Sequence, residues 1–172
     1  MKVLIAGGSG FLGSALTRSL QKDGHDVIVL SRRAPKTPNQ LLWDGRTTGG
    51  WGRIVNEVDA VVNLTGFGLE HWPWTARQKK RFVDSRILPG RALASAIKDA
   101  SHRPGVFLQI SGINYYGLRG EGTADEFTPP AEDFLRGDAG DGLARCKGAA
   151  GSLGGACHGA QGAHFRAFFL RG

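Results

Sequence analysis

The sequence predicts a doubly wound parallel α/β sheet, and three observations lead to this fold class. Short aliphatic runs, typical of strands buried on both faces of a sheet, alternate with stretches that have the apolar spacing of helices. The connections are short, and right-handed crossovers between parallel strands leave few other arrangements. The chain of 172 residues is 41% hydrophobic and 22% charged, which fits one globular domain rather than a disordered chain or a membrane bundle.

Four short, mainly apolar segments are predicted to form the strands. Each is made mainly of aliphatic or β-branched residues and is followed by glycine or a polar residue, as in strands of a parallel sheet. In chain order they are Val3–Ala6, Asp26–Leu30, Ala60–Leu64 and Val106–Ile110. Between the second and third strands, proline and glycine residues make Ala34–Gly50 a loop, and Trp51–Val58 is long enough for a short helix only.

Two longer helices are predicted to connect these strands. Phe11–Lys22 has apolar residues at every third or fourth position, and Gly24 follows it as a C-cap. The segment Thr75–Ala100 begins with the capping-box pattern Thr-x-x-Gln and is predicted to be helical. Within it, Pro89 and Gly90 are expected to kink the helix or to split it in two.

The last 37 residues, Arg136–Gly172, have a different composition. Ten of them are glycine, and only His164–Leu170 is expected to form a strand. Because such a segment buries too little apolar surface to offset its ordering entropy, Arg136–Gly162 is predicted to be poorly ordered. One hypothesis is a shifted reading frame, since permitted codons for Asp141–Gly162, read one nucleotide later, encode a helix and then a strand. The chain therefore divides into a partial domain, residues 1–135, and a tail, residues 136–172, that is either genuine or frame-shifted.

Charge and cysteine content exclude several classes of function. The formal net charge of +7 suits phosphate-bearing partners, but the basic run Gln78–Arg81 lacks the interleaved aromatic residues of nucleic-acid binders. The two cysteines, Cys146 and Cys157, provide neither a disulfide framework nor zinc-ligand spacing. No run approaches the roughly 18 apolar residues of a membrane span. We therefore expect a cytoplasmic protein that binds no metal, nucleic acid or membrane, and whose oligomeric state the sequence does not give.

A glycine-rich turn between the first strand and the first helix is the most specific functional motif. Its glycines, at positions 7, 8, 10 and 13, satisfy both G-x-x-G-x-x-G and G-x-G-x-x-G. Glycine here allows a tight turn, a close approach to a pyrophosphate and close packing of helix on strand, while the helix N-terminus supplies unpaired N–H donors. A purely structural turn is the alternative. The residues predicted to bind a dinucleotide are Gly7, Ser9, Gly10, Phe11, Leu12 and Gly13.

The residues that end the second strand predict the kind of dinucleotide. A site selective for NAD usually has an Asp or Glu here, which accepts hydrogen bonds from the adenosine ribose. This chain has Ser31, Arg32 and Arg33 instead. A guanidinium binds a 2′-phosphate through charge-assisted hydrogen bonds worth about 1.5–3 kcal/mol each. NADP is therefore the expected cofactor and NAD the alternative, unless the arginines form only a solvated basic turn.

Four further segments complete a pattern shared with a known family. They are Trp43-Asp44-Gly45, Trp74-Thr75-Ala76-Arg77-Gln78-Lys79, Asp84-Ser85-Arg86 and the acidic run Asp125–Leu135. With these and the glycine turn, residues 1–135 resemble the atypical and extended short-chain dehydrogenases/reductases, in particular the epimerase-family branch of the NAD-dependent epimerase/dehydratase proteins. The resemblance implies a Rossmann-like fold. In this chain we expect the fold to be incomplete and to be followed by the glycine-rich irregular C-terminal segment. The resemblance also implies a nicotinamide cofactor and a nucleotide-sugar-like or unknown small-molecule substrate.

The resemblance assigns further site residues by position. Asn63, Thr65 and Gly66 match the segment after the third strand that lies along the cofactor. Ser111 matches the active-site serine at the end of the fourth strand, where its hydroxyl would donate to a substrate oxygen or else merely cap a loop. Tyr116 matches the tyrosine of the Tyr-Gly that follows, and is more often a packing or substrate-contact residue than a proton donor.

One departure from the family leaves catalysis open. The wider family's proton-transfer pair is Tyr-x-x-x-Lys, but Arg119 and Gly120 stand four residues after the two tyrosines, so that the lysine is absent. We expect an NADP-preferring protein that, if active, moves hydride between the nicotinamide and a hydroxyl or carbonyl group. The alternatives are a non-catalytic NADP-sensing module and a nonfunctional truncated fragment.

Overall fold

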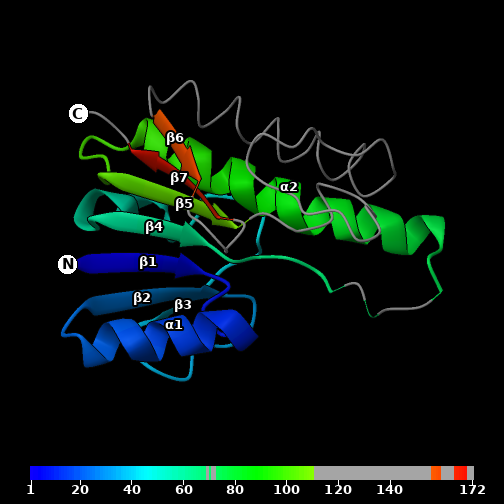
Figure 1. The fold of residues 1–172 in the computed structure, drawn as a ribbon, viewed down its shortest axis with the longest axis horizontal. Helices are drawn as coiled ribbons and strands as arrows, with labels where there is room; N and C mark the ends of the chain where they lie inside the picture. Colours follow the sequence, from blue (N-terminus) through cyan, green and yellow to red (C-terminus); the bar gives the residue numbers. More distant parts are fainter. Residues whose placement is uncertain (69, 71–72, 111–155, 160–164, 170–172) are drawn as a thin grey trace.

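The computed structural model describes residues 1–68, 70, 73–110, 156–159 and 165–169, whose strands form one seven-stranded sheet (Figure 1). The strand order is β3-β2-β1-β4-β5-β7-β6. In chain order the strands are β1 (Lys2–Ala6), β2 (Asp26–Ser31), β3 (Gln40–Leu42), β4 (Ala60–Asn63), β5 (Val106–Ile110), β6 (Ala156–Gly159) and β7 (Phe165–Phe169). All neighbours from β3 to β5 are parallel, which confirms the predicted fold class. Because β1 lies between β2 and β4, the carboxyl ends of three strands meet around the turn that follows β1.

Helices cover both faces of the parallel sheet (Figure 1). The helix α1 (Phe11–Lys22) packs on one face, while α2 (Ala76–Asp99) and the 3-10 helix η1 (Gly52–Glu57) pack on the other. Side chains of β1 alternate between the two layers, since successive residues of a strand point to opposite faces. Leu4 contributes to the core under α2, and Ile5 to the core under α1.

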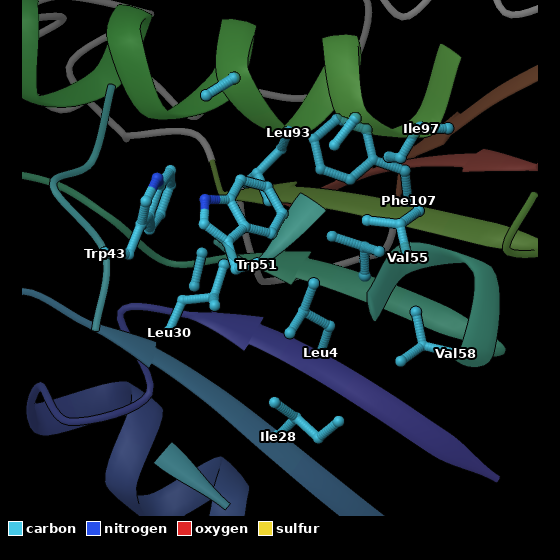
Figure 2. Close-up of a cluster of buried hydrophobic side chains, with 14 residues drawn as sticks. Leu4, Ile28, Leu30, Trp43, Trp51, Val55, Val58, Leu93, Ile97 and Phe107 are labelled. Atoms are coloured by element: carbon cyan, nitrogen blue, oxygen red, sulfur yellow. The ribbon is translucent and has the colours of Figure 1, made fainter. Parts of the chain in front are cut away.

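The larger core lies between the sheet and α2, and two tryptophans fill its end nearest the carboxyl edge of the strands (Figure 2). Trp43 and Trp51 are 4% and 1% exposed, and Leu93 of α2 packs in the same cluster. Burying a side chain of this size is worth at least about 1.5–3 kcal/mol. The loop between β3 and η1 is thus anchored in the core at both ends.

The ends of both long helices agree with the sequence. Gly24 has a φ of +80°, its N–H donates to the Gln21 carbonyl, and the His25 N–H donates to the Leu20 carbonyl, which is a Schellman motif. At the start of α2, the Thr75 hydroxyl accepts a hydrogen bond from the Gln78 N–H at 3.3 Å. The predicted C-cap and N-cap are both confirmed.

The helix α2 continues through Pro89, so of the two predicted alternatives, a kink or a split at Pro89, the split is wrong. A proline removes one backbone donor and crowds the carbonyl four residues earlier, here that of Ser85. The turns beyond Pro89 bury Leu93 and Ile97 completely against the sheet. Their packing keeps the two halves of the segment in one helix.

Two parts of the sheet differ from the expectations. Gln40–Leu42, within the predicted loop, forms β3 and pairs with β2. At the opposite edge, β7 lies inside the predicted strand His164–Leu170 but runs antiparallel to β5, and β6 falls in a stretch predicted to lack regular structure. The sequence of β6, Ala-Cys-His-Gly, has no apolar alternation from which a strand could be predicted.

Candidate functional site

A cleft of about 520 Å³ opens at the carboxyl edge of the parallel strands. Five segments line it: the turn after β1, the end of β2, the loop after β3, the loop after β4, and the middle of α2. Ligands of doubly wound sheets bind at this edge, where connections leave the sheet in opposite directions. The cleft brings together eight of the predicted cofactor residues, namely Gly7, Ser9, Gly10, Ser31, Arg32, Arg33, Thr65 and Gly66.

The glycine turn is built by close backbone contacts. Gly7 has a φ of +82° and donates its N–H to the Leu30 carbonyl, which ties the turn to the end of β2. Gly13 does not line the cleft but lies beneath it. A Cβ on Gly13 would sit 2.5 Å from the Gly8 Cα and even closer to the Gly7 carbonyl oxygen. Only glycine at position 13 allows α1 to approach the turn this closely.

The N-terminus of α1 points its unpaired donors toward the turn without a side-chain cap. Gly10 is the N-cap residue, no side chain accepts from the first turn, and that turn contains no acidic residue. The first N–H groups of a helix have no intrahelical acceptor and carry the positive end of the dipole. Phe11 and Leu12 stand at this end with 92% and 53% of their surface exposed. Their backbone, rather than their side chains, is suited to binding an anion.

Ser31 joins the end of β2 to the glycine turn. Its hydroxyl is 3.1 Å from the Ser9 hydroxyl and accepts a hydrogen bond from the Arg33 N–H at the same distance. Ser31 is buried, whereas Arg32 and Arg33 are exposed and line the cleft. The serine therefore fixes the backbone from which the two guanidinium groups project.

The loop after β3 forms a wall of the cleft that the sequence did not assign to the site. Trp43, Asp44, Gly45 and Arg46 all line the cleft. The Asp44 carboxylate accepts hydrogen bonds from the backbone N–H of Arg46 and of Thr47, and from the Thr47 hydroxyl, at 2.8–2.9 Å. These hydrogen bonds lower the pKa of Asp44 below the ordinary value of 3.8, and those from the backbone N–H groups of Thr47 and Arg46 have the largest effect. The Asp44 carboxylate thus forms its hydrogen bonds within its own turn.

Asn63, the last residue of β4, holds the start of the loop that forms the next wall of the cleft. Its side chain is fully buried, donates to the Gln109 side chain of β5 at 2.7 Å, and accepts from the backbone and hydroxyl of Thr65. Thr65 and Gly66 line the cleft, while Asn63 does not. If Asn63 contributes to cofactor binding as predicted, it would do so indirectly, by positioning Thr65.

Two neighbouring residues of α2 hold the backbone of Phe67 in the same loop. The Ser85 hydroxyl accepts from the Phe67 N–H at 2.8 Å, and the Arg86 guanidinium donates to the Phe67 carbonyl at 3.1 Å. Arg86 also stacks on the Phe82 ring, 3.6 Å from its centroid. Burial lowers the pKa of Arg86 to about 10. The Asp-Ser-Arg segment singled out in the sequence therefore orients the loop after β4.

The two candidate catalytic residues, Ser111 and Tyr116, lie outside the described residues, so their roles stay predictions. In the described ranges, no cluster of three or more His, Cys, Asp or Glu side chains is placed to hold a metal ion. None of the described helices combines the length and apolar character needed to cross a bilayer.

Comparison with known proteins identifies the family. A model of the NAD dependent epimerase/dehydratase family matches residues 3–136. The epimerase family protein Mb2239 of Mycobacterium bovis is 35% identical over 133 residues, which are 77% of this chain and 44% of that protein. The epimerase family protein SDR39U1 of Bos taurus is 36% identical over 138 residues, 78% of this chain and 45% of its own. The chain thus spans less than half the length of these relatives.

Solved structures give the same result for the fold. The crystal structure of human SDR39U1 (isoform 2) with NADPH has a TM-score of 0.72 and 30% identity, and covers 87% of this chain and 48% of its own. UDP-N-acetylglucosamine 4-epimerase from Bacillus cereus, at 24% identity and a TM-score of 0.67, shares the fold. Since the family model matches most of the residues and the cleft is built from the expected segments, the chain belongs to the NAD-dependent epimerase/dehydratase family.

Proposed function

We propose that this chain binds a dinucleotide, with a preference for NADP, and uses it to oxidise or reduce a hydroxyl or carbonyl group of a small molecule. The observation that carries the proposal is the composition of the cleft, which combines an uncapped helix N-terminus and a glycine turn with the exposed guanidinium groups of Arg32 and Arg33. The human relative crystallised with NADPH supports the same cofactor.

The residues present fit a dinucleotide. A pyrophosphate needs backbone N–H donors that it can approach closely, and the turn at Gly7–Gly10 offers a backbone surface with no Cβ except that of Ser9. Thr65 and Gly66 would lie along the bound cofactor from the β4 side. The absence of an acidic residue among Ser31, Arg32 and Arg33 removes the group that would repel a 2′-phosphate.

The bound nicotinamide would supply the hydride chemistry, and this chain would supply orientation. Ser111 would donate a hydrogen bond to a substrate oxygen at the carboxyl end of β5, and Tyr116 would contact the substrate. The substrate class we propose is nucleotide-sugar-like, by analogy with the family. The missing lysine of the Tyr-x-x-x-Lys pair favours a second candidate, a non-catalytic protein that binds NADP and reports its level.

Titration of the purified chain with NADPH and with NADH tests the cofactor. We expect NADPH to bind at least several-fold more tightly, and Arg32→Ala to remove most of the difference, because each guanidinium–phosphate contact is worth about tenfold in affinity. Equal affinities for the two cofactors in the unmodified chain would contradict NADP preference. Nicotinamide absorbance that changes on adding a nucleotide-sugar would favour the enzyme, and binding without any such change would favour the sensing module.

A further inference from the structure

The loop after β3 carries a third guanidinium group into the end of the cleft where Arg32 and Arg33 lie. Arg46 is exposed and lines the same cleft as the two arginines after β2. The Arg32 Cδ lies 3.8 Å from the position that a Cβ on Gly45, the residue before Arg46, would occupy. The loop after β3 therefore lies against Arg32, and arginines from two loops that are separated in the sequence by all of β3 line one cleft.

The guanidinium groups at this end of the cleft form no ion pair within the part of the chain that the structure describes. Among the described residues, no carboxylate lies within 4.0 Å of the guanidinium groups of Arg32, Arg33 or Arg46. Asp44 also lines the cleft, but its oxygens are held by donors from Arg46 and Thr47 within its own turn. Like charges that share one region raise its electrostatic energy, and a bound anion relieves that cost.

The turn that carries Arg46 is held in place before any ligand binds. The Thr47 carbonyl accepts from the indole N–H groups of both Trp43 and Trp51, which are buried in the core. Gly45 has a φ of +74°, which lets the chain reverse between Asp44 and Arg46. A backbone fixed in this way needs less ordering when a ligand binds, so more of the contact energy appears as affinity.

We propose that Arg46 is a specificity-determining residue, which binds the 2′-phosphate of NADP together with Arg32 and Arg33. The inference rests on the proposed NADP preference and extends it to the β3 loop. A phosphate monoester has three acceptor oxygens and close to two negative charges at neutral pH, so it can accept from several guanidinium groups at once. NADH has a ribose hydroxyl at the same place and gives Arg46 no anion to bind.

Titration of Arg46→Ala with NADPH, NADH, adenosine 2′,5′-bisphosphate and 5′-AMP tests this assignment. We expect the dissociation constants of NADPH and of the bisphosphate to rise at least about tenfold, and those of NADH and 5′-AMP to change less than about twofold. Arg46→Lys keeps the charge but loses the planar donor pair. Its dissociation constants for NADPH and the bisphosphate should therefore lie between those of the unmodified chain and those of Arg46→Ala. The matched control is Arg53→Ala, which removes an exposed arginine of η1 outside the cleft and should leave all four affinities unchanged.

The outcomes separate this inference from the proposed function. If Arg46→Ala leaves the preference for NADPH intact while Arg32→Ala removes it, the assignment of Arg46 is wrong and the NADP site stands. If Arg46→Ala weakens NADPH and NADH equally, the residue supports the turn and does not read the phosphate, which also overturns the inference. If the unmodified chain binds both cofactors equally, NADP preference itself fails, and the role of Arg46 fails with it.

Discussion

Trp43 and Trp51 donate their indole N–H groups to the same acceptor, the carbonyl oxygen of Thr47, at 2.8 and 2.9 Å. Their rings meet edge to face, with centroids 5.2 Å apart and an interplanar angle of 63°. Figure 2 shows both rings between the sheet and α2. Since a carbonyl oxygen has two lone pairs, both donors can be satisfied at once. The core thereby controls the conformation of a loop that lines the cleft.

Replacing the two tryptophans together should cost more than the sum of the single replacements. Trp43→Phe or Trp51→Phe removes one donor but leaves the Thr47 carbonyl paired with the other. The double variant removes both, so we expect an excess loss of about 1 kcal/mol in the free energy of unfolding. Urea denaturation of the four proteins in the cycle measures this coupling. Additive losses would mean that the two hydrogen bonds act independently.

The contribution of Asp44 to stability should depend on pH. Its pKa is lowered in the folded chain, so its stabilising effect is complete above the ordinary pKa of 3.8 and is lost as the pH falls through the lower folded value. Asp44→Ala should therefore be less stable than the unmodified chain at neutral pH, and the difference should shrink below about pH 4. Denaturation midpoints measured across this range give the answer. A difference that is the same at neutral and at acid pH would rule out the ionised carboxylate as the cause.

Gly13→Ala should weaken both folding and NADPH binding. The added Cβ would overlap the backbone of Gly7 and Gly8, so α1 must move away from the turn, at a cost of about 1–3 kcal/mol. Gly49→Ala is the matched control, because a Cβ there meets nothing within 4 Å and the backbone is not left-handed. The control should change the free energy of unfolding by less than about 0.5 kcal/mol. Equal effects of the two substitutions would argue against close packing at Gly13.

Gln109→Leu should destabilise the sheet by about 1–3 kcal/mol, because it leaves the buried Asn63 amide without its acceptor. Gln21→Leu, on the exposed face of α1, provides a surface control and should stay within about 0.5 kcal/mol of the unmodified chain. Thermal unfolding followed by circular dichroism compares the two. If Gln109→Leu unfolds at the same temperature as the control, the pair between β4 and β5 contributes nothing to stability.

The elements that the sequence predicted are those whose own side chains carry the information. Runs such as Val27–Leu30 are buried on both faces and therefore purely apolar, and the caps at Gly24 and Thr75 depend on local geometry. By contrast, β3 has only three half-exposed or exposed residues and is a strand because its backbone pairs with β2. No local pattern reports such a pairing.

The candidate site divides in the same way. The glycine turn and the arginines after β2 follow directly in sequence from a recognisable strand, so that their positions could be predicted. Arg46 comes into the cleft only because Trp43 and Trp51 are drawn into the core on either side of it. The role of Ser85 and Arg86 likewise depends on where α2 crosses the loop after β4, which is a property of the tertiary structure.

The antiparallel pairing of β7 has a consequence for how the sheet can grow. A strand has two hydrogen-bonding edges, and those of β5 are taken by β4 on one side and by β7 on the other. A parallel strand that extended the doubly wound order beyond β5 would need the edge that β7 occupies. The two arrangements are mutually exclusive, so any chain segment that joins the sheet at β5 must first displace β7. Among the described strands, none pairs with the outer edge of β6, so a segment that joins there displaces none of them.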